Sequence, residues 1–200
     1  IQVRNPYGVI IASPSDGEFA TSEPNYDGTA PINNPVDLTW EDSNGTTVAT
    51  LTVNSDPTTG AWSAPAQGFG DGTYVLTASS TTVNGTFTDV ATFTIDTIAP
   101  VLTIATPADG SATTDTTPTI SGTSDPNQEV VVTITDDGGN VVEVLNPIAD
   151  MSGNWTVDAS ALADGAYTVD AVATDVAGNT TPAGPNNFVV DNTPPPITLD

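Results

Sequence analysis

The sequence predicts an all-β protein made of two tandem β-sandwiches, and three observations carry this prediction. Hydrophobic and polar residues alternate with a period of two, as in half-buried antiparallel strands. Gly and Pro, 17 of each, interrupt the chain too often for long helices. One set of motifs occurs twice, 93 to 95 residues apart, which indicates a tandem repeat.

The repeat is defined by pairs of matching segments. Residues 9–17 match 102–110, residues 60–62 match 153–155, residues 71–74 match 164–167, and residues 93–100 match 188–195. The predicted domains are therefore residues 1–97 and 98–194, and residues 195–200 are expected to start a linker to a following domain.

The second copy shows the strand pattern most clearly. Strands are expected at residues 101–106, 118–122, 129–136, 141–145, 154–158, 166–174 and 186–190. Val130, Val132 and Ile134 take every second position in the third of these, and Tyr167 and Val169 do so in the sixth. Seven short strands in about 95 residues are typical of an immunoglobulin-like Greek-key sandwich, and the two copies are expected to form an extended rod.

Aromatic residues recur at equivalent positions of the two copies and are expected to pack in the cores. Trp62 matches Trp155, and Tyr74 matches Tyr167. Each Tyr follows an Asp-Gly pair at the start of the sixth strand. This is the position of a tyrosine corner, in which the hydroxyl bonds back to the preceding loop.

The charge of the chain is extreme and limits its function. The sequence has 25 Asp and Glu residues, one basic residue (Arg4), no His and no Cys, so its formal charge is -24. Nucleic acid and anionic membranes are not expected as partners, because both need Lys or Arg to neutralise phosphate. No apolar run approaches the roughly 18 residues of a membrane span.

The same composition argues against an enzyme. Without His, Cys or Lys, the chain has no Ser-His or Cys-His nucleophile, no Schiff-base amine and no phosphate-binding loop. A glycosidase with two carboxylates remains formally possible. The acids, however, fall at loop tips, so no catalytic residue is predicted.

The positions of the acids favour calcium. Alternate loops of an up-and-down sandwich lie at opposite poles, which places Asp16, Asp71 and Asp96 of the first copy at the junction with Asp125 and Asp175 of the second. Carboxylates in this number repel one another, and they suit Ca²⁺, which takes six to eight oxygen ligands. Mg²⁺ demands a stricter octahedron, and Zn²⁺ lacks its usual His and Cys ligands.

A second set of acids, Asp109, Asp164 and Asp191, would form an equivalent site only with a following domain. Asp is also the commonest turn residue, and Asp42, Asp136 and Asp137 are expected to serve hairpin turns. The sequence does not decide between a turn role and a metal-binding role for Asp16, Asp71 and Asp125. Calcium is favoured at Asp96 and Asp175, because neither position needs an acid for turn geometry.

Three motifs carry a resemblance: D-T-I-A-P at 96–100, A-D-G-A-Y at 163–167 and T-D-V-A-G-N at 174–179. They resemble the tandem bacterial immunoglobulin-like repeats of giant calcium-dependent surface adhesins, the RTX-type proteins secreted by type I systems. The resemblance implies Ca²⁺ at the junction on Asp96, Asp125 and Asp175. It also implies a monomer at the bacterial cell surface, with neighbouring repeats as partners and a role in adhesion and biofilm.

The first copy departs from this pattern. Pro31 stands where the second copy has Asp125, and residues 79–89 form a hairpin without the D-x-A-G-N motif. Its outer pole therefore lacks the acidic set. The first copy either starts the array or joins a different neighbour through residues 1–7.

The leading function is a non-catalytic, calcium-rigidified spacer. The alternatives are a module that binds a glycan or a protein, and an accessory domain of a secreted enzyme. Trp40, Trp62 and Trp155 could stack on sugars, but they are in register with inward-facing residues. An ice-binding face is not expected, because no regular T-x-T ladder is evident in the sequence.

Overall fold

The computed structural model describes residues 8–194 and divides into two compact units, Ile1–Ile98 and Ala99–Asp200. Every regular element in the described residues is a β-strand. No helix there is long and apolar enough to cross a membrane. The predicted linker at 195–200 and the N-terminal residues 1–7, with Arg4, lie outside the described residues.

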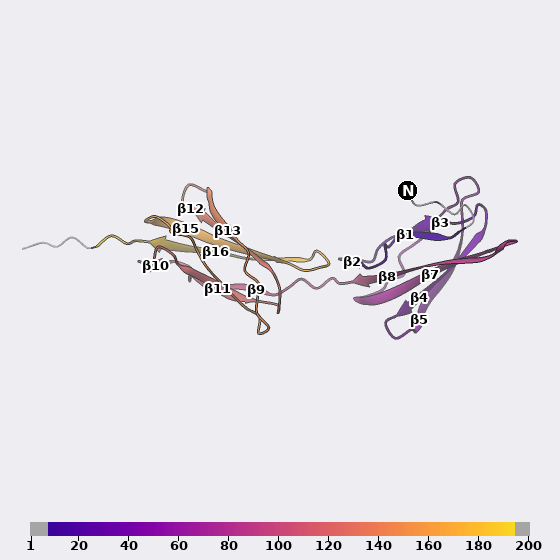
Figure 1. Ribbon diagram of the computed structural model, residues 1–200, viewed down its shortest axis with the longest axis horizontal. Coiled ribbons are helices and arrows are strands. Elements are labelled where there is room, and N and C mark those ends of the chain that lie inside the picture. Colours follow the sequence, from indigo (N-terminus) through magenta and orange to yellow (C-terminus); the bar gives the residue numbers. More distant parts are fainter. Residues whose placement is uncertain (1–7, 195–200) are drawn as a thin grey trace, which may run out of the picture. The chain divides into compact units, whose positions relative to one another are not determined.

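The second unit is a sandwich of a three-stranded and a five-stranded sheet (Figure 1). The first sheet has the order β14 (Asn154–Asp158), β11 (Thr119–Ser124) and β9 (Leu102–Thr106). The second has the order β10 (Ser111–Thr113), β16 (Thr180–Val190), β15 (Gly165–Thr174), β12 (Val130–Asp136) and β13 (Val141–Leu145).

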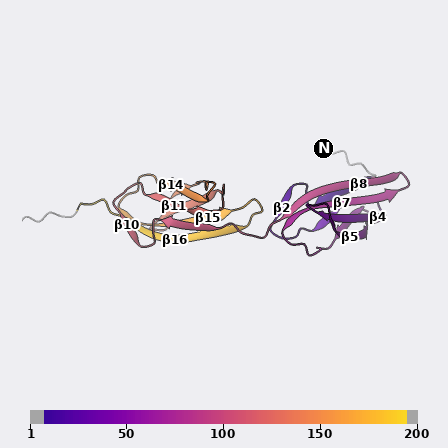
Figure 2. The ribbon, with the colours of Figure 1, turned by 90° about the horizontal axis from the view of Figure 1, so that it is seen from below.

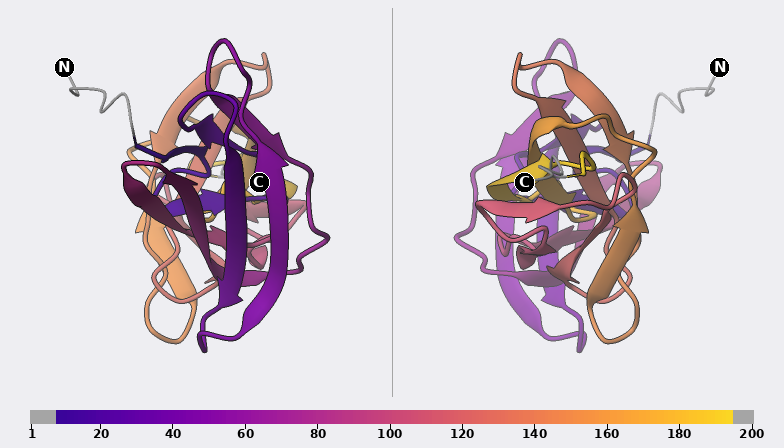
Figure 3. Two further views of the ribbon diagram at one scale, coloured as in Figure 1. Left: turned by 90° about the vertical axis from the view of Figure 1, so that its right-hand side faces the viewer. Right: turned by 90° about the vertical axis from the view of Figure 1, so that its left-hand side faces the viewer.

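The first unit repeats this arrangement, and Figure 2 shows its long strands β7 and β8 side by side. Its three-stranded sheet has the order β1 (Ile10–Ser13), β3 (Tyr26–Thr29) and β6 (Ala61–Ala64). Its five-stranded sheet has the order β2 (Glu18–Ala20), β8 (Gly85–Ile95), β7 (Gly72–Thr82), β4 (Pro35–Asp42) and β5 (Thr47–Asn54). The prediction of an all-β fold with two sandwiches is confirmed; Figure 3 shows the strands from two further sides.

Three features of the strands differ from the expectation. The short parallel strands β2 and β10 were not predicted, because three residues carry too little periodicity. Strand β16 begins at Thr180 and not near 186; Pro182 and Pro185 disguise it, and they are tolerated because this part of β16 pairs only with β15. Strand β13 pairs with β12, whereas the fourth strand of a constant-type immunoglobulin domain joins the other sheet.

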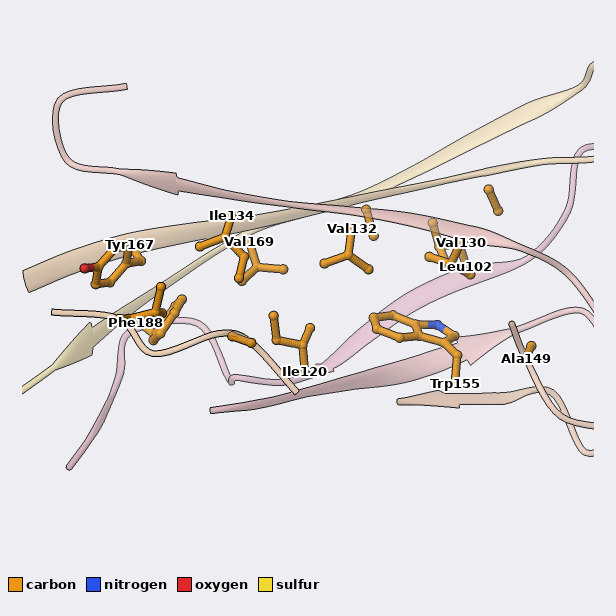
Figure 4. Packing of buried hydrophobic residues seen from close by; sticks show 14 of the residues in the cluster. Leu102, Ile120, Val130, Val132, Ile134, Ala149, Trp155, Tyr167, Val169 and Phe188 are labelled. Atoms are coloured by element: carbon orange, nitrogen blue, oxygen red, sulfur yellow. The ribbon is translucent and has the colours of Figure 1, made fainter. Parts of the chain in front are cut away.

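The core of the second unit lies between its two sheets (Figure 4). Tyr167 and Phe188 lie at one end of the core and Trp155 at the other, with Ile120 and Val132 between them. The two rings at the first end are stacked, with centroids 5.6 Å apart. Strand residues of alternating burial supply this core, as the period of two predicts.

The tryptophans are core residues in both units. Trp40, Trp62 and Trp155 are only 0%, 3% and 1% exposed, so none of them offers a stacking surface for sugars. In the second unit the indole of Trp155 covers Gly122 of the neighbouring strand. A Cβ atom at Gly122 would lie 2.5 Å from Cζ2 of Trp155 and 1.9 Å from the carbonyl oxygen of Thr103.

The tyrosine corners are present in both units. The hydroxyl of Tyr167 donates to the carbonyl of Ala163 at 2.9 Å, and that of Tyr74 donates to the carbonyl of Gly70 at 3.0 Å. Each bond joins the start of a long strand, β15 or β7, to the loop before it.

Threonine covers the outer face of the five-stranded sheet in the first unit. On β7 and β8 the outward residues are Thr73, Val75, Thr77, Ser79, Thr81, Thr86, Thr88, Val90, Thr92 and Thr94. Val75, Ser79 and Val90 interrupt the threonines, so the T-x-T pattern is not regular along this face. Thr is a strong β-former with a polar group, and in a chain that lacks Lys it fills the solvent face of a strand.

Replacing Gly122 by Ala is expected to destabilise the second unit. The added methyl would overlap backbone as well as the indole of Trp155, and overpacking of this kind costs about 1–3 kcal/mol. Gly165→Ala is the matched control, because its Cβ would make only ordinary contacts with the ring of Tyr167. Chemical denaturation measures both, and equal midpoints for the two variants would contradict the prediction.

Removing the hydroxyl of Tyr167 with Tyr167→Phe is expected to lower the free energy of unfolding by about 1 kcal/mol, the net value of one hydrogen bond. The ring and its stacking on Phe188 are retained. Denaturant unfolding checks this, and a stability unchanged within error would mean that the corner bond contributes nothing.

Candidate functional site

The loops at one pole of the second unit are tied together by hydrogen bonds. The side-chain amide of Gln128 donates to the carbonyl of Thr174 at 2.7 Å, which joins the loop after β11 to the end of β15. The hydroxyl of Thr181 donates to the carbonyl of Pro100. This pole therefore gathers the start of β9 and the loops that carry Asp125 and Asp175, as the predicted strand directions require.

The carboxylate of Asp175 organises its own loop. Its Oδ1 accepts the backbone N–H groups of Ala177, Gly178 and Asn179 at 2.8 to 2.9 Å, and its Oδ2 accepts the side-chain amide of Asn179. The T-D-V-A-G-N motif is thus an Asp-anchored turn. The expectation that position 175 needs no acid for turn geometry is wrong.

The acids of the first unit also bind backbone amides. Asp16 accepts the N–H of Thr92, Asp71 accepts the N–H and hydroxyl of Thr97, and Asp96 accepts the N–H of Ile98. At Asp96, too, the acid therefore serves the turn. Asp125 of the second unit does the same through Oδ2, which accepts the N–H of Val101 at 3.2 Å.

The second predicted set repeats these bonds one module later. Asp109 accepts the N–H of Asn187, Asp164 that of Asn192, and Asp191 that of Thr193. Equivalent acids thus occupy equivalent turns in both units.

The described residues contain no Lys, Arg or His, so hydrogen-bond donors are the only partners of these carboxylates there. Within the described part of either unit, no three acids lie close enough together to hold a metal ion. The predicted ligand sets draw on residues of two successive domains, and metal binding by them stays a prediction.

Some acids that stabilise loops were not predicted. Asp150 accepts the N–H groups of Ser152 and Asn154, and Asp56 accepts those of Thr58 and Thr59 in the matching loop. The shared signal is an Asp three or four residues before a Gly with positive φ.

Glu23 joins the core of the first unit to a loop. It accepts the hydroxyl of buried Tyr26 and the N–H groups of Gln67, Gly68 and Phe69. Burial first, and the bond to Glu23 second, raise the pKa of Tyr26 well above its usual value. The second copy has no equivalent acid, so comparing the two copies could not reveal it.

The hairpin acids behave differently from one another. Asp42 and Asp136 accept the backbone N–H groups of their turns, as expected. Asp137 has no hydrogen-bond donor among the described residues, so its predicted turn role is wrong. Only five described acids share this state: Asp27, Glu41, Glu129, Asp137 and Asp170.

Backbone donors lower the pKa of several loop acids. The N–H of Asn154 and then that of Ser152 lower the pKa of Asp150. At Asp175 burial acts to raise the pKa, but the bonds from Asn179, Gly178 and Ala177 together outweigh it and the pKa is lowered. Both acids therefore favour the folded state when ionised.

Acid is expected to destabilise the second unit. Because the folded pKa of Asp150 lies below its unfolded value of about 3.9, its contribution is complete above that pH and is lost as the pH falls through the folded pKa. Melting temperatures between pH 6 and pH 3 should fall, and fall less in Asp150→Asn. A melting temperature that rises throughout would show that relief of charge repulsion dominates.

Comparisons with known proteins find one family model that matches residues of the second unit. Residues 105–192 match the family model described as bacterial Ig-like domain. No curated protein matches the chain.

Among solved structures, a tetra-tandem repeat in the extending region of a large adhesion protein is 27% identical, with 92% of this chain and 49% of that chain covered and a TM-score of 0.41. The chain thus spans about half the length of that structure. The fibronectin(III)-like modules of Clostridium thermocellum CbhA are 20% identical, with 91% and 93% covered and a TM-score of 0.47. The BSP domain of a biofilm-associated protein is 19% identical, with 94% and 30% covered and a TM-score of 0.31. The second unit therefore matches the bacterial Ig-like domain family over nearly its whole length.

Proposed function

We propose that the chain is a non-catalytic extender segment of a bacterial cell-surface adhesin, of the RTX-type secreted class, in which tandem Ig-like domains hold a distant binding region away from the cell. The observation that carries this proposal is the repetition of one sandwich with one set of loop acids. Strand β8 ends at Ile95 and β9 begins at Leu102, so the chain segment between the two sandwiches is residues 96–101. The family match of the second unit supports the same function.

Calcium is the proposed source of rigidity. Asp16, Asp71 and Asp96 would supply oxygen ligands from the first domain, and Asp125 and Asp175 would supply them from the second. A carboxylate has about four lone-pair sites, and the bonds to Val101 and Thr97 use one at Asp125 and two at Asp71. These oxygens fit Ca²⁺ chemically, and the ion would supply positive charge that the described residues lack.

The site at Asp109, Asp164 and Asp191 would need a following domain to complete it. The proposed partners are thus neighbouring repeats of the same chain, outside the cell. No catalytic step is proposed, because the described carboxylates mostly serve turns and no His, Cys or Lys accompanies them.

Calcium is expected to stabilise the protein and to restrict the motion of the two units. Extracellular modules bind Ca²⁺ at about 10⁻⁴ to 10⁻³ M, and a tenfold excess over Kd adds about 1.4 kcal/mol per site. Melting temperature and small-angle scattering, each with Ca²⁺ and with chelator, measure the two effects. Identical curves under both conditions would overturn the proposal.

The variant Asp125→Asn separates metal binding from folding. Asn keeps a side-chain oxygen for the N–H of Val101 but removes the charge, so the calcium effect should shrink while the calcium-free melting temperature stays. Glu129→Gln is the charge-matched control, because the Glu129 carboxylate has no donor among the described residues. Equal calcium effects in the two variants would remove Asp125 from the site.

A further inference from the structure

A hollow of about 500 Å³ lies on the outer face of the five-stranded sheet in the second unit. Its floor includes Ala166 and Val189, which lie opposite each other on β15 and β16, and the neighbouring Thr168. Val189 is 42% exposed. The turn between β12 and β13 lines the hollow with Asp136 and Asp137, and Asp170 of β15 also lines it.

Two of the lining acids are not used by the fold. Asp136 holds its own turn through the N–H of Asn140. Asp137 and Asp170 have no hydrogen-bond donor among the described residues, a state they share with only three other described acids. The hollow thus combines an apolar floor with two carboxylates that the described structure leaves uncompensated.

The positions of the first unit that match the floor and the two free carboxylates carry other side chains. Tyr74 and Tyr167 occupy equivalent register positions opposite Phe93 and Phe188. By this register, Thr73 and Thr94 replace Ala166 and Val189, and their hydroxyls bond to each other at 3.0 Å. Ser43 and Thr77 replace Asp137 and Asp170. The side chains proposed to bind the ligand are therefore specific to the second unit.

The chemistry of the hollow selects its ligand. An apolar floor favours an aliphatic group, and uncompensated carboxylates favour a cation above it. Lys and Arg side chains have this form, since they bury an aliphatic stem and keep a charged head at the surface. A bare metal ion fits less well, because no three acids of the described residues lie close enough together to hold one and an alkyl floor offers no oxygen ligand.

We propose that this hollow is a docking site for a basic side chain, Lys or Arg, of a partner protein. The aliphatic stem would lie on Ala166 and Val189, and the cationic head would lie between the carboxylates of Asp137 and Asp170. Charge complementarity supports a basic partner, because the described residues contain no cation that could compete for the hollow.

The test is a titration of the whole chain with the peptides acetyl-Gly-Lys-Gly-amide and acetyl-Gly-Arg-Gly-amide in the presence of a chelator. Binding is measured by the NMR chemical shifts of the backbone amides. At least one should give saturable shifts at residues 166–168 and 187–189, and none at the equivalent face of the first unit. The same peptide with norleucine in place of the basic residue keeps the stem without the charge and should not bind. Absence of a saturable shift with both basic peptides would overturn the proposal.

Matched variants test whether the peptide is attracted by the total negative charge of the chain and not by this hollow. The double variant Asp137→Asn and Asp170→Asn should weaken binding at least fivefold. Glu41→Gln with Glu129→Gln removes the same charge elsewhere and should leave affinity unchanged. Neither pair has a hydrogen bond to lose in the described structure, and unchanged melting temperatures confirm folding. Equal losses in both double variants, or equal binding of the norleucine peptide, would overturn the proposal.

Discussion

The rest of the structure depends on how carboxylates are stabilised without cationic side chains. The described residues contain no Lys, Arg or His, so an Asp cannot form an ion pair with a side chain there. Backbone N–H groups at loop turns take that role, as at Asp150, which accepts two of them, and at Asp175, which accepts three. The loops are thus folded around their acids, and acid positions and turn positions coincide.

This coincidence explains how far the sequence could predict the site. Strand direction correctly placed Asp125 and Asp175 in loops at one pole of the second unit, because alternation of hydrophobic residues fixes the strands. It could not separate a turn acid from a metal ligand, because both use the same side chain at the same place. The misjudged role of Asp137 shows the same limit, since only the bonding of its neighbour Asp136 reveals that the turn does not need it.

The central strands were easier to predict from the sequence than the edge strands. Strands such as β12 and β15 carry core residues at every second position, so period and burial agree. The parallel strand β10 is too short to show a period, and Pro182 and Pro185 conceal the first half of β16 because an edge tolerates residues that a central strand excludes. The two copies therefore share the arrangement of their strands and differ in the side chains on the outer face of the five-stranded sheet. Threonines lie on this face of the first copy, and a hollow lies on that of the second.

The scarcity of basic residues has a consequence for cleavage by proteases. Trypsin-like proteases recognise a basic side chain in their specificity pocket, and Arg4 is the one such residue in the sequence. Residues 5–200 therefore offer these proteases no cleavage site, whether the sandwiches are folded or transiently open. This resistance follows from the composition and does not depend on stability, so trypsin-like proteases find no site in residues 5–200 even when one of the domains unfolds.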